Sequence, residues 1–347
     1  MTLGSLFDGL GGWQLAATRS GIKPLWSSEI DKFCCQISKR HFPDTVQLGD
    51  INQIHDAPFV DIITAGSPCV DISVAGKRGG IHCERSGLFF KAVELVRRVN
   101  PKFFVWENVT GAFNSNGGAD FQAVIETILQ EQIPLPRYWS NAGLVDGRFC
   151  QIAWRTLDAQ YWGCPQRRKR IFLVADFAGR RAAKILFERE SLRGHSQTSK
   201  GSQQIAATRL GENSHCSIFD ITHTHEVLRH IHGDIVNCLN ARMGTGGNQV
   251  PVVVFGIGRD AFNQGKNAKF KPTIERDLQP PLTARGAGAV CFNNIIRRLT
   301  PVECERLMGL PDDWTAGVSD SQRYKMLGNG MAQPCADFIL RRLHHDS

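Results

Sequence analysis

The first seventeen residues constrain the fold of this chain more than any other stretch. Residues 2–7 form a short, largely apolar run that predicts a strand, residues 8–12 (DGLGG) predict a glycine-rich turn, and residues 13–17 keep a helical pattern. A glycine-rich turn between a first strand and a first helix lets the backbone approach a nucleotide-like ligand closely. The sequence therefore predicts an α/β chain whose first turn binds a cofactor.

Two acidic residues extend this expectation. Glu29 follows the predicted strand 24–28, about twenty residues after the turn, which is the spacing of the acidic residue that binds ribose hydroxyls in such folds. The glycine pattern is not the G-x-G-x-x-G of dinucleotide sites, so an adenosyl ligand without a pyrophosphate fits better than NAD. Asp50, at the end of a possible third strand, either accepts from an adenine amino group or caps a turn.

A single cysteine follows the next strand. Residues 60–65 are a β-branched run ended by Gly66, which is typical of a strand buried on both faces of a parallel sheet. Ligands of open α/β sheets bind beyond the carboxyl ends of the strands, which is where Cys69 falls. Pro68 fixes its own φ and restricts Ser67, and so aims the following side chain. Cys69 is either a nucleophile or an inert buried thiol.

A carboxylate and a cationic segment occupy similar positions further along. Glu107 follows the buried strand 103–106, where large apolar neighbours favour a protonated carboxyl; a salt bridge is the alternative. Apolar strands are predicted at 151–157 and 170–175. They flank residues 166–170 (QRRKR), which fit either a ridge that contacts phosphates or a solvated edge strand.

Helical patterns separate the predicted strands. Residues 88–99 and 120–129 keep helical spacing, and the first of these runs ends at Asn100 and Pro101. Between Cys69 and the first helix, residues 74–80 are basic and glycine-rich, which predicts a loop that closes over an anionic substrate. Strands that alternate with helices predict a mostly parallel sheet.

Length and composition favour a globular cytosolic protein of about two domains. The chain has 347 residues, no signal peptide and no stretch that would span a membrane. Its 11 cysteines contain no C-x-x-C pair, which argues against a disulfide framework and a structural zinc site, and indicates a reducing compartment. A net charge of +8 suits a polyanionic partner, although it also suits a solvated surface.

Together these segments resemble the cytosine-C5 DNA methyltransferases, in order and in spacing, over residues 1–175 and 297–347. Six motifs carry the resemblance: Phe7-x-Gly9-x-Gly11-Gly12, Pro68-Cys69, Glu107-Asn108-Val109, Gln166-x-Arg168-x-Arg170, residues 298–314 (RLTPVECERLMGLPDDW) and residues 328–334 (GNGMAQP). Two positions depart from the family pattern: Val70 stands where many members carry glutamine, and Ser67 where phenylalanine is frequent.

The resemblance implies a fold and three parts. Residues 1–175 are expected to form a Rossmann-like S-adenosylmethionine-dependent methyltransferase domain with a mostly parallel sheet. Residues 176–296, which hold most of the net positive charge, are expected to form a smaller, irregular, β-rich target-recognition domain. Residues 297–347 are expected to carry the closing motifs, with the last helix returning to the catalytic domain.

The resemblance also assigns site residues. By position in its motifs, the catalytic residues are Cys69, Glu107, Arg168 and Arg170. The expected contacts of S-adenosylmethionine are Phe7, Gly9, Gly11, Gly12, Glu29, Ile30, Asp50, Ile51, Ser67, Pro68, Leu88, Asn329 and Gly330. The expected DNA contacts are Ser73, Lys77, Arg78, Gln166, Arg242 and Arg285, the last two from a repeated L-x-A-R-x-G element that serves equally well as a structural turn.

The implied activity is methyl transfer to C5 of a flipped cytosine in double-stranded DNA, by a monomer in the cytoplasm near the nucleoid. No metal is expected, because residues 223–232 contain four histidines without the ligands that would complete a site. A cognate restriction endonuclease is a further expected partner. The alternatives are a tRNA cytosine-C5 methyltransferase, a non-catalytic DNA-binding regulator on the same scaffold and, more distantly, a nicotinamide oxidoreductase.

Overall fold

The computed structural model of the chain describes residues 1–68, 87–187 and 299–345, together with the backbone of the short strands that lie between residues 219 and 298. The chain divides into two compact units. The first unit comprises Met1–Asp158, Lys169–Gln197 and Cys335–Ser347, and the second comprises Ala159–Arg168 and Thr198–Pro334.

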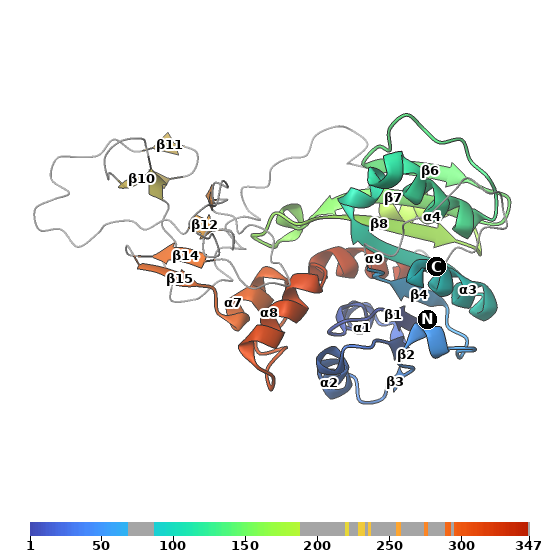
Figure 1. Cartoon of the computed structure of the whole chain (residues 1–347), viewed down its shortest axis with the longest axis horizontal. Coiled ribbons are helices and arrows are strands. Elements are labelled where there is room, and N and C mark those ends of the chain that lie inside the picture. Colours follow the sequence, from blue (N-terminus) through green and yellow to red (C-terminus); the bar gives the residue numbers. More distant parts are fainter. Residues whose placement is uncertain are drawn as a thin grey trace, which may run out of the picture. The chain divides into compact units, whose positions relative to one another are not determined.

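An eight-stranded sheet with the order β3-β2-β1-β4-β5-β8-β7-β6 forms the centre of the first unit (Figure 1). The strands β1 to β5 pair in parallel, and β8, β7 and β6 continue the sheet in antiparallel pairings. Their bounds are β1 Thr2–Leu6, β2 Lys23–Ser28, β3 Val46–Gln47, β4 Ile62–Ala65, β5 Phe103–Val109, β6 Ala142–Asp146, β7 Gln151–Asp158 and β8 Lys169–Asp176. The predicted Rossmann-like α/β fold is confirmed.

The helices of this unit follow the strands in the alternation that the sequence predicts. They are α1 Gly12–Arg19, α2 Lys32–His41, α3 Leu88–Val99, α4 Ala119–Leu129, α5 Ala182–Leu186 and α9 Gln333–His345, with 3₁₀ turns at Ile51–Gln53, Thr110–Phe113 and Ser115–Gly118. The helices expected at 13–17, 88–99 and 120–129 are confirmed. Asp31 begins α2 by accepting hydrogen bonds from Phe33 N and Cys34 N, and a left-handed Asn100 ends α3.

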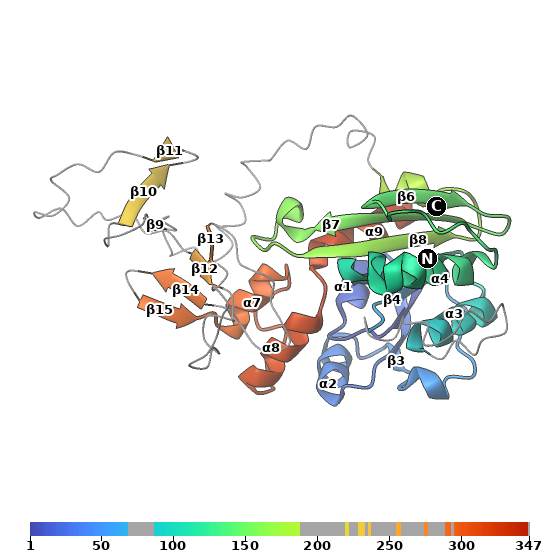
Figure 2. The ribbon, with the colours of Figure 1, turned by 45° about the horizontal axis from the view of Figure 1, so that its top comes forward.

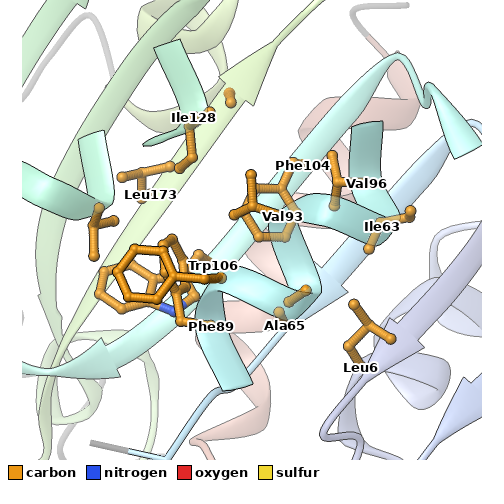
Figure 3. Close-up of a cluster of buried hydrophobic side chains, with 14 of the residues drawn as sticks. Leu6, Ile63, Ala65, Phe89, Val93, Val96, Phe104, Trp106, Ile128 and Leu173 are labelled. Atoms are coloured by element: carbon orange, nitrogen blue, oxygen red, sulfur yellow. The ribbon is translucent and has the colours of Figure 1, made fainter. Parts of the chain in front are cut away.

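The two faces of the sheet are covered by different helices. On one face, α3 and α4 pack on β4 and β5, and Figure 3 shows Phe89 and Val93 of α3 beside Trp106, Phe104 and Ile63. On the other face, Trp13 of α1 makes an edge contact with Phe172 of β8, with ring centroids 6.3 Å apart. Because β5 is covered on both sides, its backbone is held firmly up to its carboxyl end.

The carboxyl-terminal helix α9 packs on elements of the first unit. Asp337 forms an ion pair with Arg19 of α1, with an Nη1 to Oδ2 distance of 2.8 Å. Arg342 donates to the carbonyls of Lys184 and Phe187, at the end of α5. The last helix therefore lies next to the first helix of the chain, and the contacts are polar at both points.

The second unit combines short antiparallel strands with helices. One sheet has the order β11-β10-β9 and the other β13-β12-β14-β15 (Figure 2). Their bounds are β9 Phe219–Ile221, β10 Leu228–His232, β11 Ile235–Val236, β12 Phe255–Ile257, β13 Ile274–Arg276, β14 Ala289–Phe292 and β15 Ile295–Arg298; the helices are α7 Pro301–Leu307 and α8 Asp320–Asn329, with a 3₁₀ turn at Ala159–Trp162. Thr300 and Glu303 form a reciprocal capping box that begins α7.

A buried carboxylate holds the helices α7 and α8 of the second unit together. Glu305 of α7 accepts hydrogen bonds from Thr315 N at 2.8 Å and from Arg323 Nη2 of α8 at 2.9 Å.

Among the described residues, every helix is too short or too polar to span a membrane.

Candidate active site

The glycine-rich turn after β1 leaves an open backbone surface at the carboxyl edge of the sheet. Phe7, Gly9 and Gly11 all have positive φ, at 54°, 60° and 85°. A Cβ added at Gly9 would meet no atom within 4 Å, whereas one at Gly11 would lie 2.9 Å from the ring of Phe42. Gly9 is therefore open towards a ligand, and Gly11 is required by its conformation and by its neighbour.

Glu29 is held against this turn by backbone N–H groups. Its Oε2 accepts from Gly9 N at 2.8 Å, and its Oε1 accepts from Ile30 N at 2.8 Å and from Asp31 N at 2.9 Å. A carboxylate oxygen has two lone pairs, so Oε2 keeps one for a further donor. The end of β2 and the glycine turn thus present a fixed, partly unoccupied acceptor.

A second carboxyl group, Asp8, lies buried beneath the turn. Its Oδ1 accepts from Ser5 Oγ at 2.6 Å, and its Oδ2 accepts from Gln14 Nε2 at 2.6 Å and from Ser38 Oγ at 3.4 Å. Burial raises the pKa of Asp8 to about 6, because loss of water outweighs these hydrogen bonds, and the nearby charge of Glu29 raises it further. Asp8 thus joins β1, α1 and α2 below the glycine-rich turn. Its role could not be predicted from the sequence.

This burial makes a prediction for stability. The pKa of Asp8 is raised in the folded state above its ordinary value of 3.8, so the folded protein binds the proton more tightly than the unfolded chain does. The contribution of Asp8 to the free energy of unfolding is fully present below pH 3.8. It declines by about 2 kcal/mol as the pH rises from 4 to 8. We expect Asp8→Asn to remove this decline.

The measurement is urea unfolding of both proteins from pH 4 to pH 8. The free energy of unfolding of Asp8→Asn, minus that of wild type, should increase with pH, because the amide cannot ionise. A difference that stays constant over this range would contradict a carboxyl group that titrates within the fold.

The residues expected around an adenine ring differ in their exposure to solvent. Ile30 is 72% exposed beside Glu29, an unusual position for a large apolar side chain. Asp50 caps a 3₁₀ turn through Oδ1, which accepts from Asn52 N at 2.9 Å and from Asn52 Nδ2 at 3.0 Å, so its Oδ2 stays available as an acceptor. Ile51, in contrast, is buried in the hydrophobic core.

The segment that leads to the predicted nucleophile is anchored to β5. Ser67 is buried, and its Oγ accepts from Trp106 Nε1 at 2.9 Å. Its carbonyl accepts from Asn108 Nδ2 at 3.1 Å, and Pro68 is exposed. Cys69 itself lies outside the described residues, as do Val70, Ser73, Lys77 and Arg78, and residues 74–80 of the expected loop.

Glu107 lies at the end of β5 and pairs with a cation from β8. The distance from Arg170 Nε to Glu107 Oε1 is 3.1 Å, and both side chains are mostly buried, with 20% and 14% of their surface exposed. Glu107 Oε2 lies 3.5 Å from the position that a Cβ of Gly66 would occupy, next to the carboxyl end of β4. Two of the predicted catalytic residues are therefore adjacent.

The other members of the basic motif face inward. Arg168 is 1% exposed, and its Nη2 donates to the carbonyls of Gly328, at 2.9 Å, and Gly330. Gln166 is fully buried and donates to Leu307 O at 3.2 Å. We interpret both residues as supports of the second unit's backbone, since Nη2 of Arg168 and Nε2 of Gln166 donate to carbonyls of that unit. Buried and exposed side chains alternate along the predicted ridge, and Arg167 and Lys169 are the exposed ones.

The remaining predicted contacts lie in both units. Leu88 is partly buried at the first position of α3 in the first unit, and in the second unit Asn329 is exposed at the end of α8 and is followed by Gly330. Arg242 and Arg285 lie outside the described residues. Within residues 1–68, 87–187 and 299–344, no group of three or more His, Cys, Asp or Glu side chains is arranged to hold a metal ion.

Comparison with known proteins identifies the family. The family described as C-5 cytosine-specific DNA methylase matches residues 1–345. Similar curated proteins include a DNA N-6-adenine-methyltransferase of Escherichia phage P1, which is 25% identical over 98% of this chain and 60% of its own length, and the type II methyltransferase M.HpaII of Haemophilus parainfluenzae, which is 27% identical over 95% of this chain and 85% of its own length. This chain thus spans less than two thirds of the phage protein.

A solved structure supports the fold. The Dnmt2 methyltransferase of S. pombe superposes with a TM-score of 0.61 over 100% of this chain and 99% of its own, at 16% sequence identity. At that identity the likeness concerns the fold alone. Because the family match extends over nearly every residue, the chain belongs to the C-5 cytosine-specific DNA methylase family.

Proposed function

We propose that this family member is a DNA (cytosine-5-)-methyltransferase that transfers a methyl group from S-adenosylmethionine to a flipped cytosine in a specific duplex sequence. The proposal rests on one observation: the expected cofactor contacts and the expected catalytic pair lie at the same edge of the sheet. The open glycine turn and the Glu29 carboxylate lie at the ends of β1 and β2, and Glu107 with Arg170 lies at the end of β5. A cofactor and a base would meet between them.

The residues at the turn fit an adenosyl cofactor. Glu29 retains an acceptor for a ribose hydroxyl, Asp50 retains an acceptor for an amino group, and the exposed Ile30 offers an apolar surface to a purine ring. Gly9 allows close approach of the ligand to the backbone. When bound, S-adenosylmethionine supplies a methyl group activated by a sulfonium sulfur.

Cys69 is the proposed nucleophile, because C5 of cytosine is too weakly nucleophilic to take a methyl group by itself. The Cys69 thiolate adds to C6, which places an electron pair on the ring. With this pair C5 would take the methyl group, whose bond to the sulfonium sulfur would break and leave its electrons on sulfur. Loss of the C5 proton to a base then returns an electron pair to the ring and expels the thiolate from C6. Cysteine suits this role because its sulfur is polarizable and ionises at modest cost near cations.

Glu107 and Arg170 are proposed to hold the ring during this addition. A protonated Glu107 donates to N3 of the base, which neutralises the charge that develops as sulfur adds. Arg170 donates to O2 of the base or to a neighbouring phosphate, and its ion pair holds the Glu107 carboxylate in place until that group takes up the proton that it gives to N3. Arg168 is assigned a supporting role here because its guanidinium is enclosed.

The target cytosine must leave the duplex, because C6 is covered by stacking within the helix. Rotation of the nucleotide out of the stack costs a few kcal/mol. The net charge of +8 suits the phosphate contacts that offset this cost. We propose that residues 176–296 contain the target-recognition part and that 297–347 close the fold.

Bisulfite sequencing of DNA from a host that lacks cytosine methylation tests the proposal. Cells that express this chain should show one short sequence in which a single cytosine resists deamination, and cells that carry Cys69→Ala should show none. Unprotected DNA together with protected cytosines in tRNA would favour the tRNA alternative. The absence of protection in both nucleic acids would contradict methyl transfer to cytosine.

A further inference from the structure

Ser67 receives two buried side-chain donors from a single strand. Trp106 Nε1 donates to Ser67 Oγ at 2.9 Å, and Asn108 Nδ2 donates to the Ser67 carbonyl at 3.1 Å and lies 3.4 Å from Oγ. All three side chains are buried, with Trp106 completely enclosed and Ser67 6% exposed. Hydrogen bonds enclosed in this way hold their geometry, because a buried donor or acceptor that loses its partner is costly.

The two donors flank Glu107 along β5. Neighbouring side chains of a strand point to opposite faces, so Trp106 and Asn108 reach Ser67 on one face while Glu107 reaches its cation on the other. Ser67 stands two positions before Cys69 in the chain. The same short piece of strand thus fixes the predicted acid and the backbone that leads to the predicted nucleophile.

Trp106 is a rigid support for this contact. Its ring packs on Phe89, with centroids 5.5 Å apart, and on Phe121, with centroids 6.2 Å apart. Figure 3 shows Trp106 next to Phe89 within the core cluster. A side chain packed on two aromatic rings cannot follow Ser67 if that residue moves, so the hydrogen bond defines where Ser67 lies.

We propose that Ser67 is a positioning residue of the methyl transfer, and that its hydrogen bond from Trp106 fixes the backbone from which the chain continues to Cys69. This role rests on the proposed function, in which Cys69 and Glu107 act on one cytosine. It is a different role from the cofactor contact that the resemblance implies for Ser67, since here the hydroxyl accepts from a buried tryptophan. Small displacements of a reacting group cost up to about 100-fold in rate.

Kinetics of Ser67→Ala and Trp106→Phe test this role. Each variant should lower kcat by about 10- to 100-fold and slow adduct formation with 5-fluorocytosine duplex DNA, while KM for DNA and Kd for S-adenosylhomocysteine stay within about 2-fold. The double variant should be no slower than the slower single variant, because both substitutions remove one contact. Ser67→Thr, which keeps the hydroxyl, should recover most of the rate.

Thr64→Val is the matched control. Thr64 lies on β4 three residues before Ser67, and its hydroxyl is likewise buried but has no hydrogen-bond partner among the described residues. We expect this variant to keep kcat within about 2-fold, because the loss of an unpaired hydroxyl moves nothing at the site. The melting temperatures of the four single variants should lie within about 5 °C of wild type.

The outcomes separate this inference from the proposed function. A wild-type protein that is active, with an equally active Ser67→Ala, would overturn the positioning role alone. So would a rate loss in Ser67→Ala that comes with weaker S-adenosylhomocysteine binding or general unfolding, or an equal rate loss in Thr64→Val. A wild-type protein that neither methylates DNA nor forms an adduct would overturn the proposed function and this role with it.

Discussion

Cys69→Ala is expected to reduce methyl transfer below about a thousandth of the wild-type rate while leaving the affinity for S-adenosylhomocysteine unchanged. The physical reason is that alanine has no electron pair to add to C6, so C5 is never activated, whereas the expected cofactor contacts Glu29 and Asp50 belong to other strands. Initial rates with tritiated cofactor and duplex DNA, together with calorimetric titration of S-adenosylhomocysteine, measure the two quantities.

Cys150→Ala provides the control for this experiment. Burial raises the pKa of the Cys150 thiol to about 12, so it holds its proton and is a poor nucleophile. Cys150 is also adjacent to the first residue of β7, at the edge of the sheet opposite to Glu107. We expect its replacement to leave the rate within about 2-fold. Retained turnover in Cys69→Ala would refute the assigned nucleophile, and loss of turnover in both variants would point to a general effect on folding.

The sequence predicted the strand ends of this fold well, because each one is marked locally. The strand β4 is a β-branched run stopped by a glycine, and β5 begins with an aromatic run and continues through Glu107 to Val109. The glycine turn after β1 was equally clear, and the structure shows its positive φ angles. Such signals depend on neighbouring residues alone, so strand ends can be predicted from them without knowledge of the tertiary structure.

The contacts that tie these ends together were not predictable, because their partners are far apart in sequence. Asp8 meets Ser38, thirty positions later, and Ser67 meets Trp106, thirty-nine positions later. Neither pair has a spacing that a helix or a strand would reveal. The helix α2 was missed for a related reason, since its amphipathic pattern is short and polar.

The basic motif is only partly exposed. Four cations in five residues suggested either a ridge of phosphate contacts or a solvated edge strand, and the structure buries Gln166 and Arg168 and leaves Arg167 and Lys169 exposed. A buried arginine requires acceptors, and Arg168 finds them in backbone carbonyls of its own unit. For Glu107 the sequence allowed either an acid or a salt bridge, and the structure shows the salt bridge, with Arg170.

Glu107→Gln is expected to lower kcat by about 100-fold or more, with a much smaller change in KM for DNA. Glutamine keeps the shape of the side chain but can neither carry the negative charge that pairs with Arg170 nor give a proton to the ring. The loss should fall mainly on kcat, because charge on the base develops only as sulfur adds. Steady-state kinetics and the rate of adduct formation with 5-fluorocytosine DNA measure this loss.

Asp146→Asn is the matched control, since Asp146 of β6 also pairs with an arginine, Arg180, which lies between β8 and α5. This pair is half exposed and lies at the edge opposite to the carboxyl end of β5, as the register of β6, β7 and β8 shows. We expect less than a 2-fold change in kcat, because a solvated ion pair contributes little. Equal losses in the two variants would mean that the sheet needs its ion pairs for folding. A Glu107→Gln variant as fast as wild type would remove Glu107 from the chemistry and leave the ring's charge to Arg170 alone.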